Sequence, residues 1–188
     1  MTTLFDKCFT YTMDMEGGEK FSDDQDDPGG ATKYGISLRF LKGITEGDID
    51  HDGDIDADDV KGLSWTSTKY IYQKHFWHPL FENLHPQIAS KLFDLRVNMG
   101  PVQATKIIQA THNELEQFLA DNERNYIEDI LEVDGVMGPK TLRACTRDEL
   151  LKPLIHQAAQ FYFNLADKRP ASQKYLLGWL RRTYSVLP

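Results

Sequence analysis

The sequence predicts a mainly α-helical protein with a small, irregular β-hairpin or loop region after its first helix. Its 188 residues suit one compact domain. Apolar residues recur at helical spacing over most of the chain, whereas residues 19–36 are rich in Asp, Gly and Pro and show no helical period. No stretch approaches the ~18 consecutive apolar residues of a membrane helix, and no secretory leader is evident, so we expect no stable membrane insertion.

The elements follow in order from hydrophobic periodicity and from stop signals. The first helix is expected over residues 4–15 and is ended by Gly17-Gly18. Further helices are expected at 38–42, 64–78, 87–99, 102–119, 139–144, 149–165 and 171–184, with a polar turn at 121–125 and a helical turn at 126–131. We expect a single domain over residues 1–188, with a loop-bearing lobe at 1–85, an insertion at 46–60 and a helical lobe at 86–188.

Charge is distributed unevenly along the chain, whose net charge is −8. Residues 1–134 hold 26 acidic against 12 basic residues, and residues 135–188 hold 3 against 9. A local acid cluster beside a modestly basic C-terminal third argues against a nucleic-acid-binding protein. Cys8 and Cys145 are too few for a disulfide framework, and we expect two buried free thiols.

Seven aspartates crowd into residues 48–59. Side-chain oxygens fall at positions 1, 3, 5, 7, 9 and 12 of a twelve-residue loop, with Gly53 at position 6, as in an EF-hand. Carboxylates this close repel one another unless a hard cation lies among them. We therefore expect one structural calcium ion, with the loop resembling the dockerin variant because position 12 is Asp; a disordered acidic linker is the alternative. The expected ligands are Asp48, Asp50, Asp52, Asp54 (through its carbonyl), Asp56 and Asp59.

The segment after the first helix has the residues that glycoside hydrolysis requires. Glu16 ends an apolar helix, where burial would raise its pKa and keep it protonated as a general acid. The Gly- and Asp-rich loop that follows can bring a second carboxylate across a cleft, and Thr32 adds a hydroxyl. The ordinary alternative is a solvent-exposed glutamate at a helix C-terminus followed by a turn.

Several ordered motifs resemble the glycoside hydrolase family 108 endolysins and muramidases of phages and bacteria. The resemblance covers the whole chain except the acid loop. The motifs are Glu16-Gly-Gly, Asp27-Pro-Gly-Gly-Ala-Thr32-Lys-Tyr34-Gly-Ile-Ser, Tyr72-Gln-Lys-His-Phe-Trp77, Phe93-Asp94-x-x-x-Asn98-x-Gly100 and Val133-Asp134-Gly135-x-x-Gly138-Pro139-x-Thr141. The last of these resembles a turn of the associated peptidoglycan-binding region, and a structural role for it is the simpler interpretation.

The resemblance implies a lysozyme-like fold and cleavage of the β-1,4 bond after N-acetylmuramic acid in peptidoglycan. It assigns Glu16 as general acid, and analogy with phage lysozymes assigns Asp27 and Thr32 to the attacking water. Asp23, Asp24 and Asp26 remain alternatives to Asp27.

Three further residues are candidates for sugar contact. Tyr34 could stack on a sugar or fill the hairpin, and Tyr72 is on an aromatic helix that would ordinarily be core. Asn98 could contact an N-acetyl group or cap its helix.

We therefore expect a monomeric endolysin that binds peptidoglycan, accumulates in the host bacterial cytoplasm, and reaches the periplasm and wall through a separate holin-type protein. The competing functions are a lytic transglycosylase acting on the same bond, a non-catalytic calcium-dependent wall-binding protein and, more weakly, a chitinase.

Overall fold

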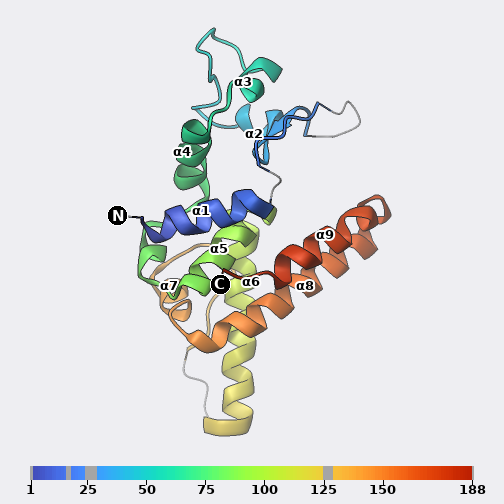
Figure 1. The fold of residues 1–188 in the computed structure, drawn as a ribbon. Helices are drawn as coiled ribbons and strands as arrows, with labels where there is room; N and C mark the ends of the chain where they lie inside the picture. The colour runs from blue at the N-terminus through green and yellow to red at the C-terminus, as the bar shows by residue number, and fades with distance from the viewer. Residues whose placement is uncertain (1, 16–17, 24–28, 125–128, 188) are drawn as a thin grey trace. The chain divides into compact units, whose positions relative to one another are not determined.

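The structure, a computed structural model, describes residues 2–15, 18–23, 29–124 and 129–187; of residues 123 and 124 it describes only the backbone. The chain divides into two compact units, Met1–His75 (unit 1) and Phe76–Pro188 (unit 2) (Figure 1). Both units are mainly helical, and unit 1 also holds a two-stranded antiparallel sheet. The predicted fold class, mainly α with a small hairpin after the first helix, is confirmed.

Unit 1 begins with a helix that is fixed at both ends by its sequence. Thr3 Oγ1 accepts a bond from the Asp6 amide while Asp6 accepts one from the Thr3 amide, a capping box. The buried side chains recur at helical spacing, which explains why this segment folds as a helix against the rest of unit 1. The elements of unit 1 are α1 (Leu4–Met15), β1 (Thr32–Lys33), β2 (Ile36–Ser37), α2 (Leu38–Leu41), α3 (Ala57–Gly62) and, up to its last residue, α4 (Trp65–Phe76).

In unit 2, glycine and proline set the helix boundaries. Gly100 has a φ of 83°, which ends α5, and Pro101 opens α6 at a position where its missing amide costs nothing. The core of the unit is formed by fully buried aliphatic and aromatic side chains such as Leu92, Phe93 and Ile108. The helices and short turns of unit 2 are η1 (Pro79–Asn83), α5 (Pro86–Met99), α6 (Pro101–Leu119), η2 (Ala120–Arg124), α7 (Pro139–Ala144), η3 (Asp148–Leu150), α8 (Leu151–Lys168), η4 (Pro170–Ser172) and α9 (Gln173–Tyr184).

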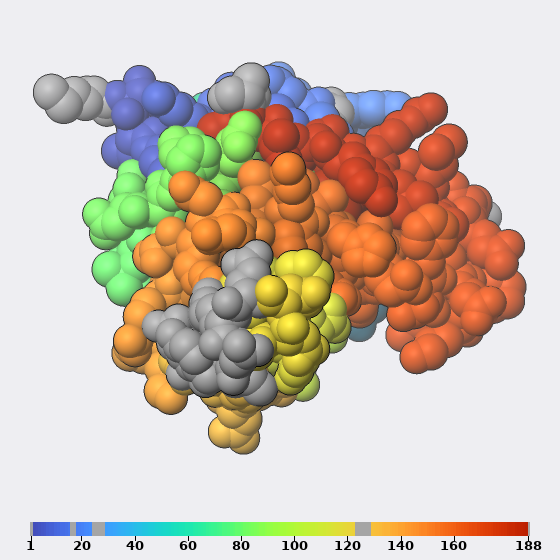
Figure 2. Space-filling view, turned by 90° about the horizontal axis from the view of Figure 1, so that it is seen from below, coloured from blue at the N-terminus to red at the C-terminus, as the bar shows by residue number. Residues whose placement is uncertain are grey.

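Helices α8 and α9 form the C-terminal hairpin of unit 2, visible in orange and red in Figures 1 and 2. Tyr162 of α8 stacks on Trp179 of α9, with 5.1 Å between the ring centroids. Burial of large aromatic surfaces at this contact explains why the two amphipathic helices pack side by side.

Three local expectations need correction. Helix α3 was not predicted, because its first turn coincides with the end of the acid loop. The polar turn expected at 121–125 is, over its described part, a π-helical turn, Ala120–Arg124. Of the helical turn expected at 126–131, residues 126–128 lie outside the described residues and residues 129–131 are not helical. Among the described helices, none is both long and apolar enough to cross a bilayer.

Candidate functional site

The end of α1 fixes the chain on one side of the proposed general acid. Met15 is the last residue of α1, and Gly18, with a φ of 68°, returns its amide to the Met13 carbonyl at 3.1 Å. Glu16 is therefore the residue that follows the helix directly. Glu16 and Asp27 themselves lie outside the described residues, as do Asp24 and Asp26; of the alternative carboxylates, Asp23 alone is described, and it is exposed.

The hairpin that carries Thr32 is held by backbone bonds on both sides. Thr32 pairs with Ser37 across the two-stranded sheet, and its amide and carbonyl exchange bonds with Ser22 at 2.8 and 2.9 Å. Tyr34 and Gly35 have φ values of 52° and 74°, the pattern of a type I′ turn. The Thr32 hydroxyl donates to the Gly30 carbonyl at 3.2 Å. Thr32 is thus held in a fixed backbone frame, with its side chain partly accessible.

Tyr34 and Tyr72 have a packing role in unit 1. Tyr34 is 6% exposed and Tyr72 is 1% exposed, and the Tyr72 hydroxyl donates to the Tyr34 carbonyl at 2.9 Å. Burial, together with the negative charge of Glu19 nearby, raises the pKa of Tyr34. Both rings therefore pack between the hairpin and α4, which is the structural role that was the alternative to sugar contact for each residue. Contact of either ring with sugar stays a prediction.

Trp65, the first residue of α4, is not among the residues that the sequence indicated for sugar contact. The side chain is 44% exposed, and its ring lies edge-on to Phe9 at 4.9 Å and to Tyr34 at 6.2 Å. An exposed indole beside the hairpin offers the apolar face on which sugar rings stack. Helical spacing cannot reveal it, because a buried aromatic would show the same period.

Asn98 belongs to a polar network in unit 2. Its side-chain amide donates to the Asp94 carbonyl at 3.0 Å and to the Asp94 carboxylate at 3.3 Å. The same carboxylate accepts from Arg182 Nε at 2.5 Å and from Lys91 Nζ at 3.4 Å. Burial lowers the pKa of Lys91. Asn98 therefore lies in the last turn of α5, exposed and oriented by Asp94, and it does not cap the helix end, since the cap position is Gly100.

The Asp134-Gly135 turn is also held by side-chain bonds. The Gln109 side-chain amide donates to the Asp134 carboxylate at 2.8 Å, and its oxygen accepts from the Gly135 amide at 2.9 Å. Gly135 has a φ of 84°, and a Cβ there would meet Val102 Cγ1 at 2.8 Å, so only glycine fits. The turn is structural, as its simpler interpretation predicted.

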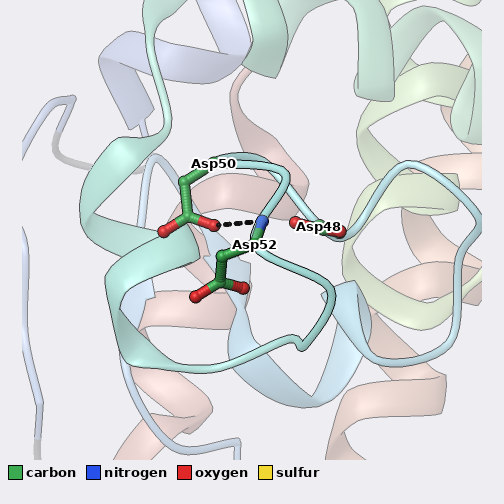
Figure 3. A group of neighbouring side chains, drawn as sticks. All are labelled: Asp48, Asp50 and Asp52. Atoms are coloured by element: carbon green, nitrogen blue, oxygen red, sulfur yellow. Dashed lines mark hydrogen bonds between the residues drawn. The ribbon is translucent and has the colours of Figure 1, made fainter.

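The acid loop of unit 1 is folded around its own backbone amides (Figure 3). The Gly53 amide donates to Asp48 Oδ2 at 3.2 Å, the Asp52 amide to Asp50 Oδ1 at 3.3 Å, and the Asp54 amide to Asp52 Oδ1 at 3.1 Å. Gly53 has a φ of 100°, the left-handed conformation that the sixth loop position requires.

Asp59 closes the loop. Its carboxylate accepts bonds from the amides of Ile49 at 2.6 Å and Asp56 at 2.7 Å, and with Asp56 it forms the capping box of α3. Burial opposes ionisation of this carboxyl, but the backbone bonds, that from Asp56 first, outweigh it and lower the pKa of Asp59. The twelfth loop position is therefore a buried, ionised carboxylate that joins the two ends of the loop.

The remaining carboxylates of the loop repel one another. Burial followed by the charge of Asp52 raises the pKa of Asp50, and the charge of Asp52 followed by burial raises the pKa of Asp54. Asp48 Oδ1 is buried and has no hydrogen-bond partner among the described residues. Carboxylate oxygens converge within 4.8 Å in two groups, which are Asp48, Asp50 and Asp52, and Asp54, Asp56 and Asp59. This donor set, with one buried oxygen unsatisfied, fits a hard divalent cation.

Lys33 connects the hairpin to the helix that leaves the loop. Its ammonium donates to the carbonyls of Lys61 and Leu63, both at 2.8 Å, at the C-terminus of α3. A cation is favourable there because the last carbonyls of a helix carry partial negative charge. These hydrogen bonds therefore connect the Thr32 hairpin directly to α3, the helix that follows the acid loop.

The two cysteines are buried free thiols, as predicted. Burial raises the pKa of Cys145 to about 12, so this thiol stays protonated at neutral pH.

Comparisons with known proteins cover nearly the whole chain. No curated protein matches the sequence significantly. Residues 9–100 match the family model described as Glycosyl hydrolase 108, and residues 104–184 match the model described as Predicted Peptidoglycan domain. A solved structure, described as that of Brucella abortus SagA, aligns over 96% of each chain with a TM-score of 0.63 and 23% identity, which shows a shared fold. Together, the two sequence matches indicate a glycoside hydrolase that acts on peptidoglycan.

Proposed function

We propose that the protein is a muramidase of the endolysin type, which hydrolyses the β-1,4 bond between N-acetylmuramic acid and N-acetylglucosamine. The observation that carries the proposal is the glycosyl hydrolase 108 match over residues 9–100, which includes Glu16, Asp27 and Thr32. In this stretch, α1 ends one residue before Glu16, and the hairpin that bears Thr32 is held by main-chain bonds to Ser22. The short chain between these two rigid elements contains Asp27.

In the proposed reaction, Glu16 donates its proton to the glycosidic oxygen as the bond to the anomeric carbon breaks. A water held by Asp27 and Thr32 attacks that carbon, and its proton passes to Asp27. A carboxyl that must donate a proton at neutral pH needs a raised pKa, which burial against apolar side chains supplies. The products are two glycan ends, of which the muramic acid end is reducing.

Two substitutions test these assignments against a control. Glu16→Gln and Asp27→Asn remove one ionisable group each, while Asp14→Asn makes the same change on an exposed position of α1. We expect the release of reducing ends from purified Gram-negative sacculi to fall roughly 10²–10⁴-fold for Glu16→Gln and Asp27→Asn, and to stay at the wild-type level for Asp14→Asn.

Each alternative function predicts another outcome. Release of 1,6-anhydromuramic ends in place of reducing ends, lost in Glu16→Gln and retained in Asp27→Asn, would identify a transglycosylase, which needs no water-activating carboxylate. A folded wild type that binds sacculi but releases nothing would leave the wall-binding function. Release of ends from chitin and not from sacculi would identify a chitinase.

We also propose that the acid loop binds one structural calcium ion. The supporting observations are the buried, unpartnered Asp48 Oδ1, the left-handed Gly53 and the two convergent groups of carboxylates. When bound, the ion would neutralise the mutual repulsion of the loop and stabilise the folded state. Asp54 would contribute its backbone carbonyl, and the other five expected ligands their carboxylates.

A calorimetric titration with calcium tests this second proposal. We expect one ion per chain for the wild type and at least a tenfold weaker site for Asp52→Asn, which removes a ligand charge. Asp58→Asn is the matched control, because Asp58 is exposed and pairs with Lys61 instead of facing the other carboxylates. If both substitutions weakened calcium affinity equally, the ion would be attracted by the overall negative charge of the loop and not held by specific ligands.

For the biological role, we propose that the enzyme acts as a monomer, is made in the host cytoplasm and reaches the wall through a separate membrane-opening protein. Expression in a bacterial host with and without a holin-type protein tests this, since lysis should require both. Lysis without the second protein would contradict it.

A further inference from the structure

A charged cavity in unit 2 lies outside every segment that the proposed reaction uses. Its volume is about 460 Å³, within the range typical of ligand sites. It lies where the C-terminal half of α6 meets α7 and the chain leading into α8; Figure 2 shows this side of the unit, with the end of α6 in yellow and the residues after 139 in orange. The residues that matter to the argument are His112, Glu116, Lys140, Arg143, Arg147 and Glu149.

Two buried polar side chains of α6 line this cavity. Glu116 is 1% exposed and forms an ion pair with Arg147. His112, one turn earlier, is 5% exposed, and its Nε2 lies 3.1 Å from the Asp129 carbonyl oxygen. That carbonyl can only accept, so Nε2 carries a proton. The other ring nitrogen, Nδ1, is buried and has no hydrogen-bond partner among the described residues. A buried polar atom left unsatisfied is rare and calls for a partner.

Two exposed residues of the cavity, one of each charge, have no charged partner among the described residues. Lys140 pairs with Asp129 at 3.3 Å, and Arg147 is already paired. Arg143 and Glu149 are exposed, and neither forms an ion pair or side-chain hydrogen bond with another described residue. A guanidinium matches a carboxylate with two parallel bonds, and a carboxylate accepts from an ammonium. The cavity therefore complements a small zwitterion better than it complements an uncharged sugar.

We propose that this cavity binds the zwitterionic end of a peptidoglycan stem peptide, with Arg143 receiving a carboxylate and Glu149 an ammonium. The inference rests on the proposed function only for the choice of polymer. In peptidoglycan the glycan strand offers mainly hydroxyl and N-acetyl groups, whereas a stem peptide ending in a diamino acid carries a free amine beside a free carboxyl. Such a site would hold the wall by its peptides while the other half of the chain acts on the glycan.

The test is calorimetric binding of the tripeptide L-Ala-γ-D-Glu-meso-diaminopimelate to the full chain. This probe has no glycosidic bond, so its binding is independent of cleavage. We expect the wild type to bind it, Arg143→Gln to bind about tenfold or more weakly, and Arg181→Gln to bind as the wild type does. Arg181 is the matched control because it is an exposed arginine of the same unit outside the cavity.

Two modified peptides make the test specific. Amidation of the carboxyl beside the free amine should weaken binding to the wild type and have little further effect on Arg143→Gln. Acetylation of the free amine of the diaminopimelate, with the L-Ala amine left unchanged, should weaken binding to the wild type and have little further effect on Glu149→Gln.

Absence of tripeptide binding, or equal affinity of Arg143→Gln and wild type, would overturn the inference. The proposed function would still stand if the same preparation cleaved sacculi. Conversely, tripeptide binding by a protein that leaves sacculi intact would support the cavity and contradict the muramidase.

Discussion

The acid loop of unit 1 and the buried ionic network of unit 2 handle charge in opposite ways. In the loop, seven aspartates of one sign share a short segment, and their partners within it are mainly backbone amides. In unit 2, the Asp94 carboxylate accepts hydrogen bonds from the cations Lys91 and Arg182 and from the amide of Asn98, so its charge is countered inside the protein. The first arrangement calls for an ion from solution and the second does not. Stability of unit 1 should therefore depend on calcium, and that of unit 2 on its own side chains.

The largest expected effect comes from breaking the internal network. Asp94→Ala would leave the nearly fully buried Lys91 without its counter-charge, and removing one partner of a buried ion pair costs about 3–5 kcal/mol. Urea unfolding measures this loss, which should be the same with and without calcium. Asp129→Asn, which opens an exposed pair with Lys140, should cost less than about 1 kcal/mol. If the loss in the free energy of unfolding caused by Asp94→Ala depended on calcium, the stability of unit 2 would not rest on its own side chains alone.

Calcium itself should act on the other unit. At a concentration 100 times its dissociation constant, an ion that binds only the folded state stabilises it by about 2.7 kcal/mol. Hydrogen exchange should show the associated protection in the loop and α3, with amides of α6 and α8 unchanged. At the same calcium concentration, Asp52→Asn, with its site at least tenfold weaker, should lose about 1.3 kcal/mol or more of this stabilisation and the matching part of the protection. Equal protection throughout both units would contradict a stabilising effect of calcium that is confined to the loop and α3.

A smaller effect is expected where the loop joins the hairpin. Lys33→Met removes both bonds from the ammonium to the carbonyls of Lys61 and Leu63, and should cost about 1–2 kcal/mol. It should also reduce calcium-induced protection of the Thr32 amide, because the connection is lost. Lys42→Met removes the same charge from an exposed site, and it should change neither the stability nor the calcium-induced protection of the Thr32 amide. Unchanged protection of Thr32 in Lys33→Met would mean that the hairpin and loop are independent.

The smallest effect concerns a partly exposed ion pair of unit 1, formed by Asp6 and Lys69. The bond from Lys69, followed by that from the Thr3 amide, lowers the pKa of Asp6 to about 2, below its unfolded value of roughly 3.9. The contribution of this carboxylate to stability is therefore fully present above about pH 4 and is lost as the pH falls through about 2. Unfolding of wild type and Asp6→Asn between pH 2 and 5 measures it. A difference between them that grows toward low pH would have the wrong sign.

Helix boundaries were largely predictable because local chemistry sets them. The 3.6-residue period located the core helices, and Gly-Gly, Gly-Pro and X-Pro steps marked their ends, as at α1, α5 and α7. Helix α3 was missed because its N-cap, Asp56, is also the ninth position of the acid loop, and one residue with two roles hides the boundary.

Long-range partners could not be predicted. Lys91 and Arg182 are far apart in sequence, and no periodicity links them to Asn98 through Asp94. The same limit applies to aromatic residues, since the buried Tyr72 and the exposed Trp65 both fit a helical pattern, and only packing separates them. The cavity around His112 and Arg143 likewise depends on how α6 meets the chain after α7, which sequence spacing does not encode.

The measurement that tests the central claim most directly is mass spectrometry of the muropeptides released from purified Gram-negative sacculi by the calcium-loaded wild type. Hydrolysis of the bond after N-acetylmuramic acid predicts fragments ending in reducing muramic acid, each heavier by one water than its 1,6-anhydro counterpart. Fragments ending in 1,6-anhydromuramic acid, or in reducing N-acetylglucosamine, would contradict it.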